Sequence, residues 1–169
     1  MTYKTNDLVL EWFDLYKIPL YGYICSLLRN RADADDVFQE TFTTLLQRGE
    51  KISKIKYPKT YIYHIARNKS FDLMKKYKKQ PVSIESLLVQ PAEEVFPDWI
   101  DAEMLNAALN KISEKEREII LLKVYDQMTF REIAKITHSL LPTVAARYLR
   151  GIKKLKKLME KNYESAKLS

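Results

Sequence analysis

The sequence contains little of several residues that catalytic and secreted folds often depend on. Three glycines in 169 residues disfavour a turn-rich β-sandwich or a glycine-lined phosphate site. Cys25 is the only cysteine, so neither a disulfide nor a thiolate metal site can form within the chain, and we expect a buried apolar side chain. The histidines His64 and His138 follow no metal-ligand pattern. These absences argue against an enzyme, a cofactor and a metal centre.

Long apolar stretches are also missing. No run reaches the roughly 18 residues that a membrane-crossing helix needs, and the N-terminus lacks the order of a signal peptide. We therefore expect a cytoplasmic protein without membrane insertion, and the charged helical segments predict an all-α fold. The net charge of +7 and the isoelectric point near 9.3 fit a polyanion such as nucleic acid, although many ordinary proteins share such values.

Charge changes sign twice along the chain. Residues 67–79 and 150–161 are strongly basic, whereas 80–104 carry six acids and no lysine or arginine. The acidic zone also contains Pro81, Pro91 and Pro97, which is typical of a linker. The sequence therefore predicts two small helical domains, at 5–79 and 101–163, joined by a flexible acidic linker at 80–100. Each basic run taken alone is equally well explained as solvated surface.

The first predicted domain begins with two helical segments. Residues 7–29 have apolar side chains at helical spacing, and Pro19 is expected to kink this helix or divide it. A second helix is expected to open at 33–36, where acids suit the helix dipole. This helix has an apolar side and a polar, acidic side, the latter made by Asp36, Gln39, Glu40 and Thr43.

A third helix is predicted from Lys59 to Lys78. At about 100° per residue, Ile62, Ile65, Ala66 and Leu73 share its apolar side. The opposite side collects His64, Arg67, Asn68, Phe71, Lys75 and Lys78. Cations that meet phosphates and flat side chains that stack on bases are what single-stranded DNA requires. Packing of Phe71 against a neighbouring element is the alternative.

The second predicted domain has the pattern of a helix-turn-helix. Capping boxes at Ser113–Glu116 and Thr129–Glu132 mark two helix starts. A short helix after Thr129 ends in a polar break, and a long helix begins near Leu141. Its outward side carries Thr143, Arg147, Arg150, Lys154 and Lys157, and it would enter the major groove. A generic basic amphipathic helix remains the alternative.

Three blocks occur in the order found in one family. Residues 13–46, with Arg31-Ala32-Asp33-Ala34-Asp35-Asp36-Val37-Phe38-Gln39-Glu40, resemble the polymerase-binding part of sigma region 2. Residues 58–76, opening Pro58-Lys59-Thr60-Tyr61, resemble its promoter-melting part, and residues 112–158, with Glu132-Ile133-Ala134, resemble sigma region 4. The chain thus resembles the extracytoplasmic-function group of sigma-70 family RNA polymerase sigma factors.

The resemblance implies a transcription initiation factor that binds core RNA polymerase and directs promoter recognition and DNA melting. Asp36, Gln39, Glu40 and Thr43 would bind the clamp helices of the largest subunit, and the second domain would touch the flap of the second-largest. The melted minus-ten element would be held by Lys51, Lys54, Lys56, Tyr57, His64, Arg67, Asn68, Phe71 and Lys75. The double-stranded upstream element would meet Thr129, Thr143, Ala146, Arg147, Arg150 and Lys154.

The turn of the second domain departs from the family's pattern. The family usually has glycine, an aliphatic residue and a capping serine, where this chain has His138, Ser139 and Leu140. Loss of the glycine makes the turn costlier, and the cap is displaced or lost. Ala145 and Ala146 can touch thymine methyls but cannot make bidentate hydrogen bonds to bases. We expect upstream recognition that is weak, unusual or assisted by another protein.

Two other functions compete with this one. A stand-alone helix-turn-helix regulator is disfavoured because the first domain has a basic, aromatic helix of its own and no ligand-pocket pattern. A nuclease would need clustered carboxylates or metal ligands, and residues 33–36 are better explained as a helix start and docking face. The sequence leaves open the target promoters, the inducing signal, and whether an anti-sigma factor or another recruiting protein binds the chain.

Overall fold

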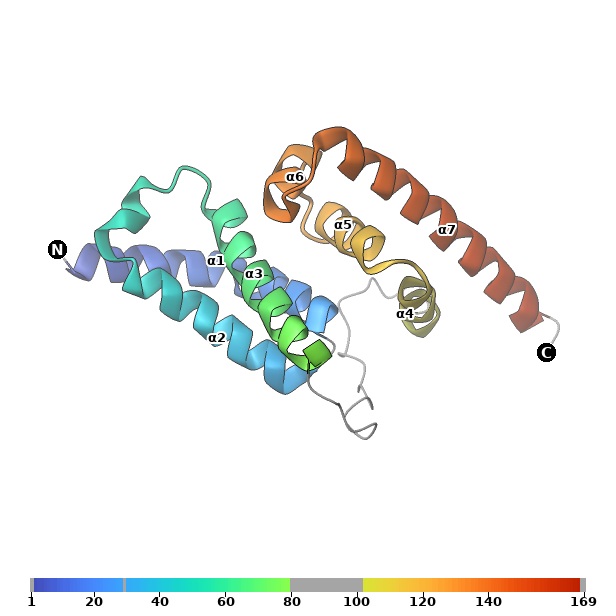
Figure 1. The fold of residues 1–169 in the computed structure, drawn as a ribbon, viewed down its shortest axis with the longest axis horizontal. Helices are drawn as coiled ribbons and strands as arrows, with labels where there is room; N and C mark the ends of the chain where they lie inside the picture. Colours follow the sequence, from blue (N-terminus) through green and yellow to red (C-terminus); the bar gives the residue numbers. More distant parts are fainter. Residues whose placement is uncertain (1, 29, 80–101, 168–169) are drawn as a thin grey trace. The chain divides into compact units, whose positions relative to one another are not determined.

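The computed structural model describes residues 2–28, 30–79 and 102–167, and every element in these ranges is helical (Figure 1). The all-α prediction is therefore confirmed, and the chain divides into two compact units, residues 1–92 and 93–169. The predicted linker at 80–100 lies outside the described residues. The first unit holds α1 (Thr2–Leu28), α2 (Arg31–Gln47), the 3-10 helix η1 (Gly49–Lys54) and α3 (Pro58–Lys79). The second holds α4 (Ala102–Lys111), α5 (Glu114–Val124), α6 (Phe130–Thr137) and α7 (Leu141–Lys167).

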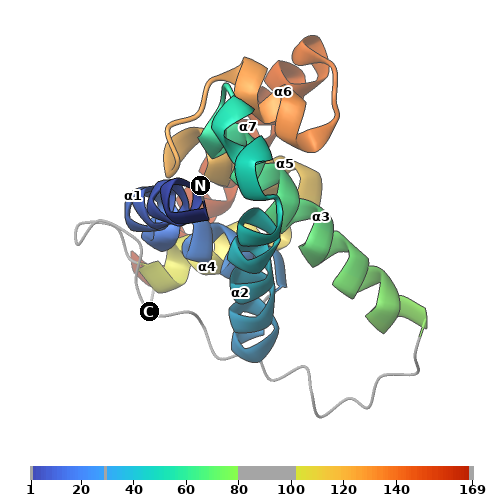
Figure 2. The same ribbon diagram turned by 90° about the vertical axis from the view of Figure 1, so that its left-hand side faces the viewer.

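An apolar core joins all four elements of the first unit. α1 contacts α2, η1 and α3, and α2 contacts α3; Figure 2 looks nearly along α1 and shows α2 crossing beside it. The core is made by large side chains that are fully or almost fully buried: Leu20 and Ile24 of α1, Leu45 of α2, Ile52 of η1, and Ile62 and Tyr63 of α3. Burying each side chain of this size stabilises the fold by roughly 1.5–3 kcal/mol, so these contacts fix which helix faces remain outside.

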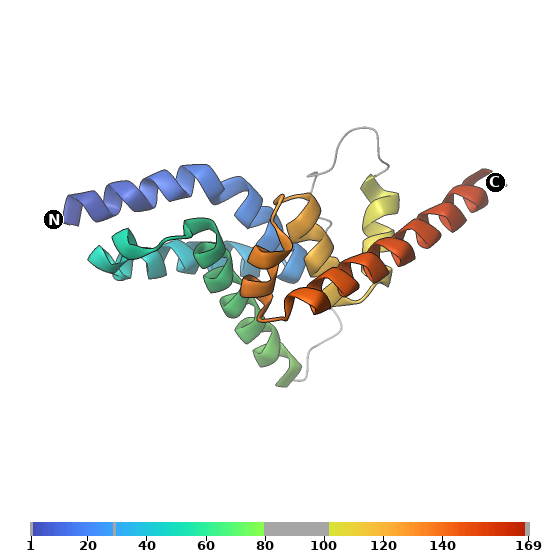
Figure 3. The same ribbon diagram turned by 90° about the horizontal axis from the view of Figure 1, so that it is seen from above.

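Pro19 lies inside α1 and does not divide it. The helix continues from Thr2 to Leu28, so of the two outcomes that the sequence allowed, division is excluded. A proline in a helix interior removes one backbone hydrogen bond and pushes against the preceding turn, which bends the helix. Figure 3 shows α1 changing direction along its length.

α2 begins two residues earlier than expected. Asn30 is its N-cap, with extended backbone, and the Asn30 side-chain oxygen accepts a hydrogen bond from the Asp33 backbone N–H at 3.3 Å. Asp33 is consequently the acid of the first turn, and Asp35 and Asp36 fall in the next one. The acids still lie at the positive end of the helix dipole, as the sequence predicted.

The second unit is built around α7, which packs against α4, α5 and α6. Both predicted capping boxes are present, at the starts of α5 and α6. Leu105, Leu109, Ile112 and Ile120 form a buried cluster, and Tyr148, Ile152, Leu155 and Met159 of α7 pack against it. α4 was not predicted from the sequence as a separate helix. The apolar side of α7, opposite the predicted outward residues, faces this cluster.

The turn between α6 and α7 uses a histidine in the left-handed backbone region. His138 ends α6 with φ 50° and ψ 41°, and the N–H groups of His138 and Ser139 both donate to the Ala134 carbonyl. Leu140 occupies the N-cap position of α7, because its carbonyl accepts from the Val144 N–H at 3.0 Å. A leucine has no side-chain oxygen with which to cap the helix.

Replacement of His138 by glycine should stabilise the second unit. Side chains with a Cβ are strained in the left-handed region, whereas glycine adopts it freely, so we expect His138→Gly to raise the unfolding free energy by about 0.5–1 kcal/mol. Urea unfolding of the full-length chain, followed by circular dichroism, measures the change. The matched control is His138→Ala, which also removes the imidazole but keeps the Cβ. Equal stability of the glycine and alanine variants would contradict the prediction.

Candidate nucleic-acid interface

One side of α3 presents polar and aromatic groups in two pairs. The Asn68 side-chain nitrogen lies 3.3 Å from Nε2 of His64, and the Arg67 guanidinium lies 4.2 Å from the centre of the Phe71 ring. Each pair joins residues four apart, which are neighbours on a helix. Lys75 is exposed one turn further along, with its ammonium 3.8 Å from Asp72. We call His64, Arg67, Asn68, Phe71 and Lys75 the α3 face.

The opposite side of α3 is buried, as the sequence predicted. Ile62 and Ala66 are fully buried, and Ile65 is almost so. Phe71 is half-buried and has Arg67 over its ring, so a flat aromatic surface and a cation are presented together. An arginine over an aromatic ring is itself attracted to it, which orders both side chains. This combination suits stacking on unpaired bases beside a phosphate.

The segment before α3 is more ordered than the polar stretch in the sequence suggests. η1 is anchored by Ile52, which is almost fully buried, while Lys51 and Lys54 are exposed. Lys56 and Tyr57 follow it, also exposed, with the Lys56 ammonium 5.5 Å from the centre of the Tyr57 ring. The Tyr57 carbonyl accepts from the Tyr61 N–H at 3.1 Å, which starts α3. The four candidate residues therefore lead directly into the α3 face.

The polar side of α2 is exposed along two turns. Asp36, Gln39, Glu40 and Thr43, which we call the α2 face, are all exposed, whereas Val37, Thr41 and Leu45 point into the core. Lys69 of α3 donates to Glu40 at 3.1 Å, so Glu40 has a partner within the unit. An ion pair this exposed contributes little to stability, and the Glu40 carboxylate remains available to other cations.

Two tyrosines hold the carboxylates at the start of α2. The Tyr77 hydroxyl donates to Asp33 at 2.7 Å and the Tyr21 hydroxyl donates to Asp35 at 2.6 Å. The hydrogen bond to Asp35, together with burial, raises the pKa of Tyr21 to about 12. The hydrogen bond to Asp33 likewise raises the pKa of Tyr77. Sequence reasoning missed both links, because they join residues far apart in the chain.

The helix-turn-helix positions its candidate residues unequally. Thr143 and Arg147 are half-buried and Ala146 is exposed, while Val144 beneath them is fully buried. Arg147 donates from Nη1 to the Ser139 hydroxyl at 3.2 Å. Ser139 therefore binds an arginine side chain and does not cap α7. The Thr129 hydroxyl is occupied by the capping box with Glu132, at 2.8 Å.

Arg150 and Lys154 share a carboxylate that the sequence did not point to. The Lys154 ammonium donates to both oxygens of Glu116, at 2.9 and 3.0 Å, and Nε of Arg150 lies 3.8 Å from one of them. Burial would raise the pKa of Glu116, but the hydrogen bonds from Lys154 and Ser113 outweigh it, so the pKa lies below its usual value. Both cations are on α7 as predicted, and both are drawn toward α5.

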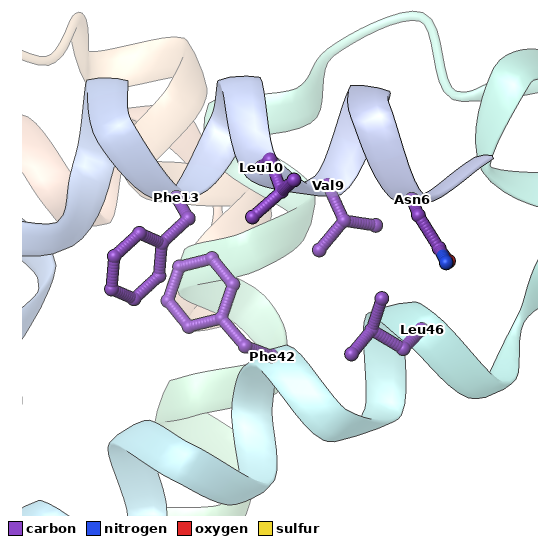
Figure 4. A pocket seen from close by; sticks show the side chains of 6 residues that line it. All are labelled: Asn6, Val9, Leu10, Phe13, Phe42 and Leu46. Carbon is purple, nitrogen blue, oxygen red and sulfur yellow. The ribbon is translucent and has the colours of Figure 1, made fainter. Parts of the chain in front are cut away.

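An apolar hollow lies between α1 and α2 (Figure 4). Leu10 and Leu46 on its rim are exposed, and Figure 4 shows their side chains pointing from opposite helices toward the same space. No pattern in the sequence predicted this hollow, and its lining offers no acid, base or nucleophile. The lining residues are Asn6, Val9, Leu10, Phe13, Phe42 and Leu46.

Metal-binding side chains are not clustered in the part of the chain that the structure describes. Among those residues, no cluster of three or more histidine, cysteine, aspartate or glutamate side chains could hold a metal ion. Cys25 is half-buried, and burial raises the pKa of its thiol. Likewise, none of the described helices is both long and apolar enough to cross a membrane.

Two family models match the sequence in order. Sigma-70 region 2 matches residues 12–80, and Sigma-70 region 4 matches residues 102–155. The first match covers α1 from Trp12 onward with α2, η1 and α3, and the second covers α4 to α6 with the first half of α7.

Curated relatives and a solved structure resemble the chain over most of its length. The RNA polymerase sigma factor SigV of Bacillus subtilis is 26% identical over 149 residues, covering 88% of this chain and 89% of SigV. The ECF RNA polymerase sigma factor SigW of the same organism is 27% identical over 166 residues, covering 90% and 89%. The sigma factor RpoE from Bartonella quintana, solved with the anti-sigma factor NepR, has a TM-score of 0.75 at 23% identity, covering 89% and 95%, and thus the same fold. The chain therefore belongs to the extracytoplasmic-function sigma factors of the sigma-70 family, non-enzymatic proteins that direct RNA polymerase to promoters.

Proposed function

We propose that the α3 face holds the melted minus-ten strand, with Lys51, Lys54, Lys56 and Tyr57 around a flipped base. The observation that carries this proposal is the Arg67–Phe71 pair at 4.2 Å, set beside His64 and Asn68 on the side of α3 opposite the buried Ile62 and Ala66. Arg67 offers a cation for phosphate and Phe71 a ring for stacking, and both are already ordered by their contact.

The α2 face is the proposed contact with the clamp helices of the polymerase largest subunit. Its four polar residues lie on one exposed side of α2, and the rest of that helix is fixed in the core by Val37 and Leu45. The Tyr21–Asp35 and Tyr77–Asp33 hydrogen bonds attach the start of α2 to α1 and α3. A rigid, acidic helix face suits a basic partner surface, because complementary charge both steers and orients association.

The α6–α7 helix-turn-helix is proposed to contact the upstream element weakly, through Thr129, Thr143, Ala146, Arg147, Arg150 and Lys154, and to touch the flap of the second-largest subunit. Leu140 replaces a capping side chain, and Ala146 is exposed where a hydrogen-bonding residue would read a base edge. Arg147 is bound to Ser139, which leaves its remaining N–H groups for DNA. This arrangement supports phosphate binding better than base discrimination.

The proposed setting is the bacterial cytoplasm, where polymerase and promoter DNA are found. The Bartonella quintana sigma factor that shares the fold was solved with an anti-sigma factor. We propose that an anti-sigma factor or another recruiting protein likewise controls this chain, in keeping with a recognition helix that discriminates bases poorly by itself.

Charge reversal on the α2 face should weaken binding to core polymerase. We expect Asp36→Arg to lower the affinity for core polymerase at least about tenfold, because it places a cation against a basic surface. Fluorescence anisotropy of the labelled full-length protein, titrated with core polymerase, measures this. Asp14→Arg is the control, since it reverses an exposed acid on α1, which pairs with Lys17. Equal affinities of the two variants would remove the α2 face from the proposed contact.

Loss of the Arg67–Phe71 pair should impair promoter melting more than polymerase binding. Base stacking on an aromatic side chain is worth roughly 1–3 kcal/mol, so Phe71→Leu should reduce the open complex about five- to a hundredfold. Permanganate reactivity of unpaired thymines in the holoenzyme complex measures melting. Leucine preserves apolar packing, so unchanged melting would mean that Phe71 is only a packing residue. The contribution of the Arg67 cation is tested by comparing promoter melting by the Arg67→Ala variant with melting by the control Lys76→Ala, which removes a lysine from a different side of α3.

Selection from a randomised promoter library tests the reading of the upstream element. With core polymerase and this protein alone, we expect a clear minus-ten motif and little sequence information upstream. Ala146→Arg, which places a bidentate donor at the exposed position, should add a preference for guanine there. A strict upstream motif from the unaltered protein would overturn the proposal of weak recognition.

A further inference from the structure

Two cations of the proposed DNA-binding helix approach the same carboxylate, that of Glu116. It lies on α5 with only 6% of its side chain exposed. Lys154 donates to both of its oxygens, and Nε of Arg150 stands 3.8 Å away. Arg150 and Lys154 themselves remain more than half exposed, at 62% and 54%. The two cations therefore bend from the surface of α7 back toward a buried anion.

Gly151 is what allows α7 to approach α5 this closely. A Cβ at that position would lie 2.8 Å from Cδ1 of Ile120 and 3.1 Å from Cβ of Glu116. Residues 150 and 154 are four apart and share one side of the helix, and residue 154 is also three residues after Gly151. The helices thus meet where α7 has no side chain, which brings the Glu116 carboxylate within reach of both cations.

The Glu116 carboxylate is also fixed at its own end. It accepts hydrogen bonds from the Ser113 hydroxyl at 2.9 Å and from the Ser113 N–H at 3.4 Å, in the capping box of α5. It cannot follow the cations if they move outward. A lysine that leaves it for a DNA phosphate leaves behind a buried anion with fewer partners, and such an anion is strongly unfavourable.

We propose that Glu116 acts as an internal substitute for a DNA phosphate, which holds Lys154 and Arg150 back and lowers sequence-independent binding of duplex DNA. This inference rests on the proposed function, in which α7 faces duplex DNA. Glu116 is then a positioning residue: it acts on DNA only through the two cations. Binding to non-promoter DNA depends mainly on phosphate contacts. By withholding two cations from phosphate, Glu116 would reduce the fraction of this basic protein that is bound to non-promoter DNA.

The substitution Glu116→Gln separates this role from the role of Glu116 in folding. Glutamine preserves the capping box, because either residue serves at that position, but it removes the charge. We expect the full-length variant to bind duplex DNA of arbitrary sequence more tightly than the unaltered protein. The slope of log affinity against log salt should steepen by about 0.9 for each cation released. Anisotropy of a labelled duplex, titrated at several salt concentrations, measures both quantities, and thermal unfolding verifies the fold.

The matched control is Glu160→Gln, which removes the same charge from α7 itself. Glu160 is an exposed partner of Lys156 at 3.9 Å, so its loss should leave the salt slope nearly unchanged. The double variant Glu116→Gln with Lys154→Met identifies the released cation, because it should lose most of the affinity that Glu116→Gln gains. A gain that survives when both Lys154 and Arg150 are replaced, or a gain that equals that of Glu160→Gln, would overturn the inference.

Arg147→Ala distinguishes the failure of this inference from failure of the proposed function. If Arg147→Ala weakens duplex binding and Glu116→Gln does not strengthen it, α7 binds DNA and Glu116 plays no part. If neither variant changes duplex binding, α7 does not face DNA and the proposed upstream contact falls as well. Weaker binding by a folded Glu116→Gln variant would mean that Glu116 directs the cations toward phosphate, the reverse of what we propose.

Discussion

In α3, the burial of Ile62 and Ala66 decides where the other side chains of that helix point. A helix turns by a fixed angle at each residue, so anchoring these positions in the core directs Arg67, Asn68 and Phe71 outward without any further interaction. The same constraint acts on α2, where Val37 and Leu45 are buried, and on α7. Each surface that we assign to a partner is the side left over after the core is formed.

The exposed sides are ordered by contacts within the protein. Arg67 lies over Phe71, Lys69 donates to Glu40, and Tyr77 donates to Asp33. Individually these exposed contacts contribute little to stability. Their importance is that a charged side chain with an internal partner must leave or share that partner when DNA or polymerase binds. The strongest such case is Lys154 with Glu116, because this carboxylate is buried and most of the others are not.

The sequence was sufficient for those features that depend on local periodicity and on caps. The all-α class, both capping boxes and the buried side of α3 follow from patterns along one helix, and the structure contains each of them. The start of α2 at Arg31 was missed because Asn30 competes with Asp33 as a cap. Periodicity also placed Arg150 and Lys154 correctly on α7, but it could not reveal where their head groups turn.

What the sequence could not give are contacts across large separations. Glu116 and Lys154 are 38 residues apart, and Asp33 and Tyr77 are 44 apart, so no local pattern joins them. Their approach depends on the packing of two helices, and at Gly151 on the absence of a single Cβ. The assignment of individual residues to DNA or polymerase is likewise beyond periodicity, and it stays a proposal.

The hydrogen bond between Ser139 and Arg147 changes what the altered turn means for binding. An arginine on a protein surface normally samples many rotamers, and binding DNA freezes most of them, which reduces the affinity. Here the hydroxyl that no longer caps α7 already restricts the Arg147 side chain before any DNA is present. The turn therefore lacks a side-chain cap for α7, but the Arg147 side chain is already restricted, so less conformational entropy is lost when it binds DNA.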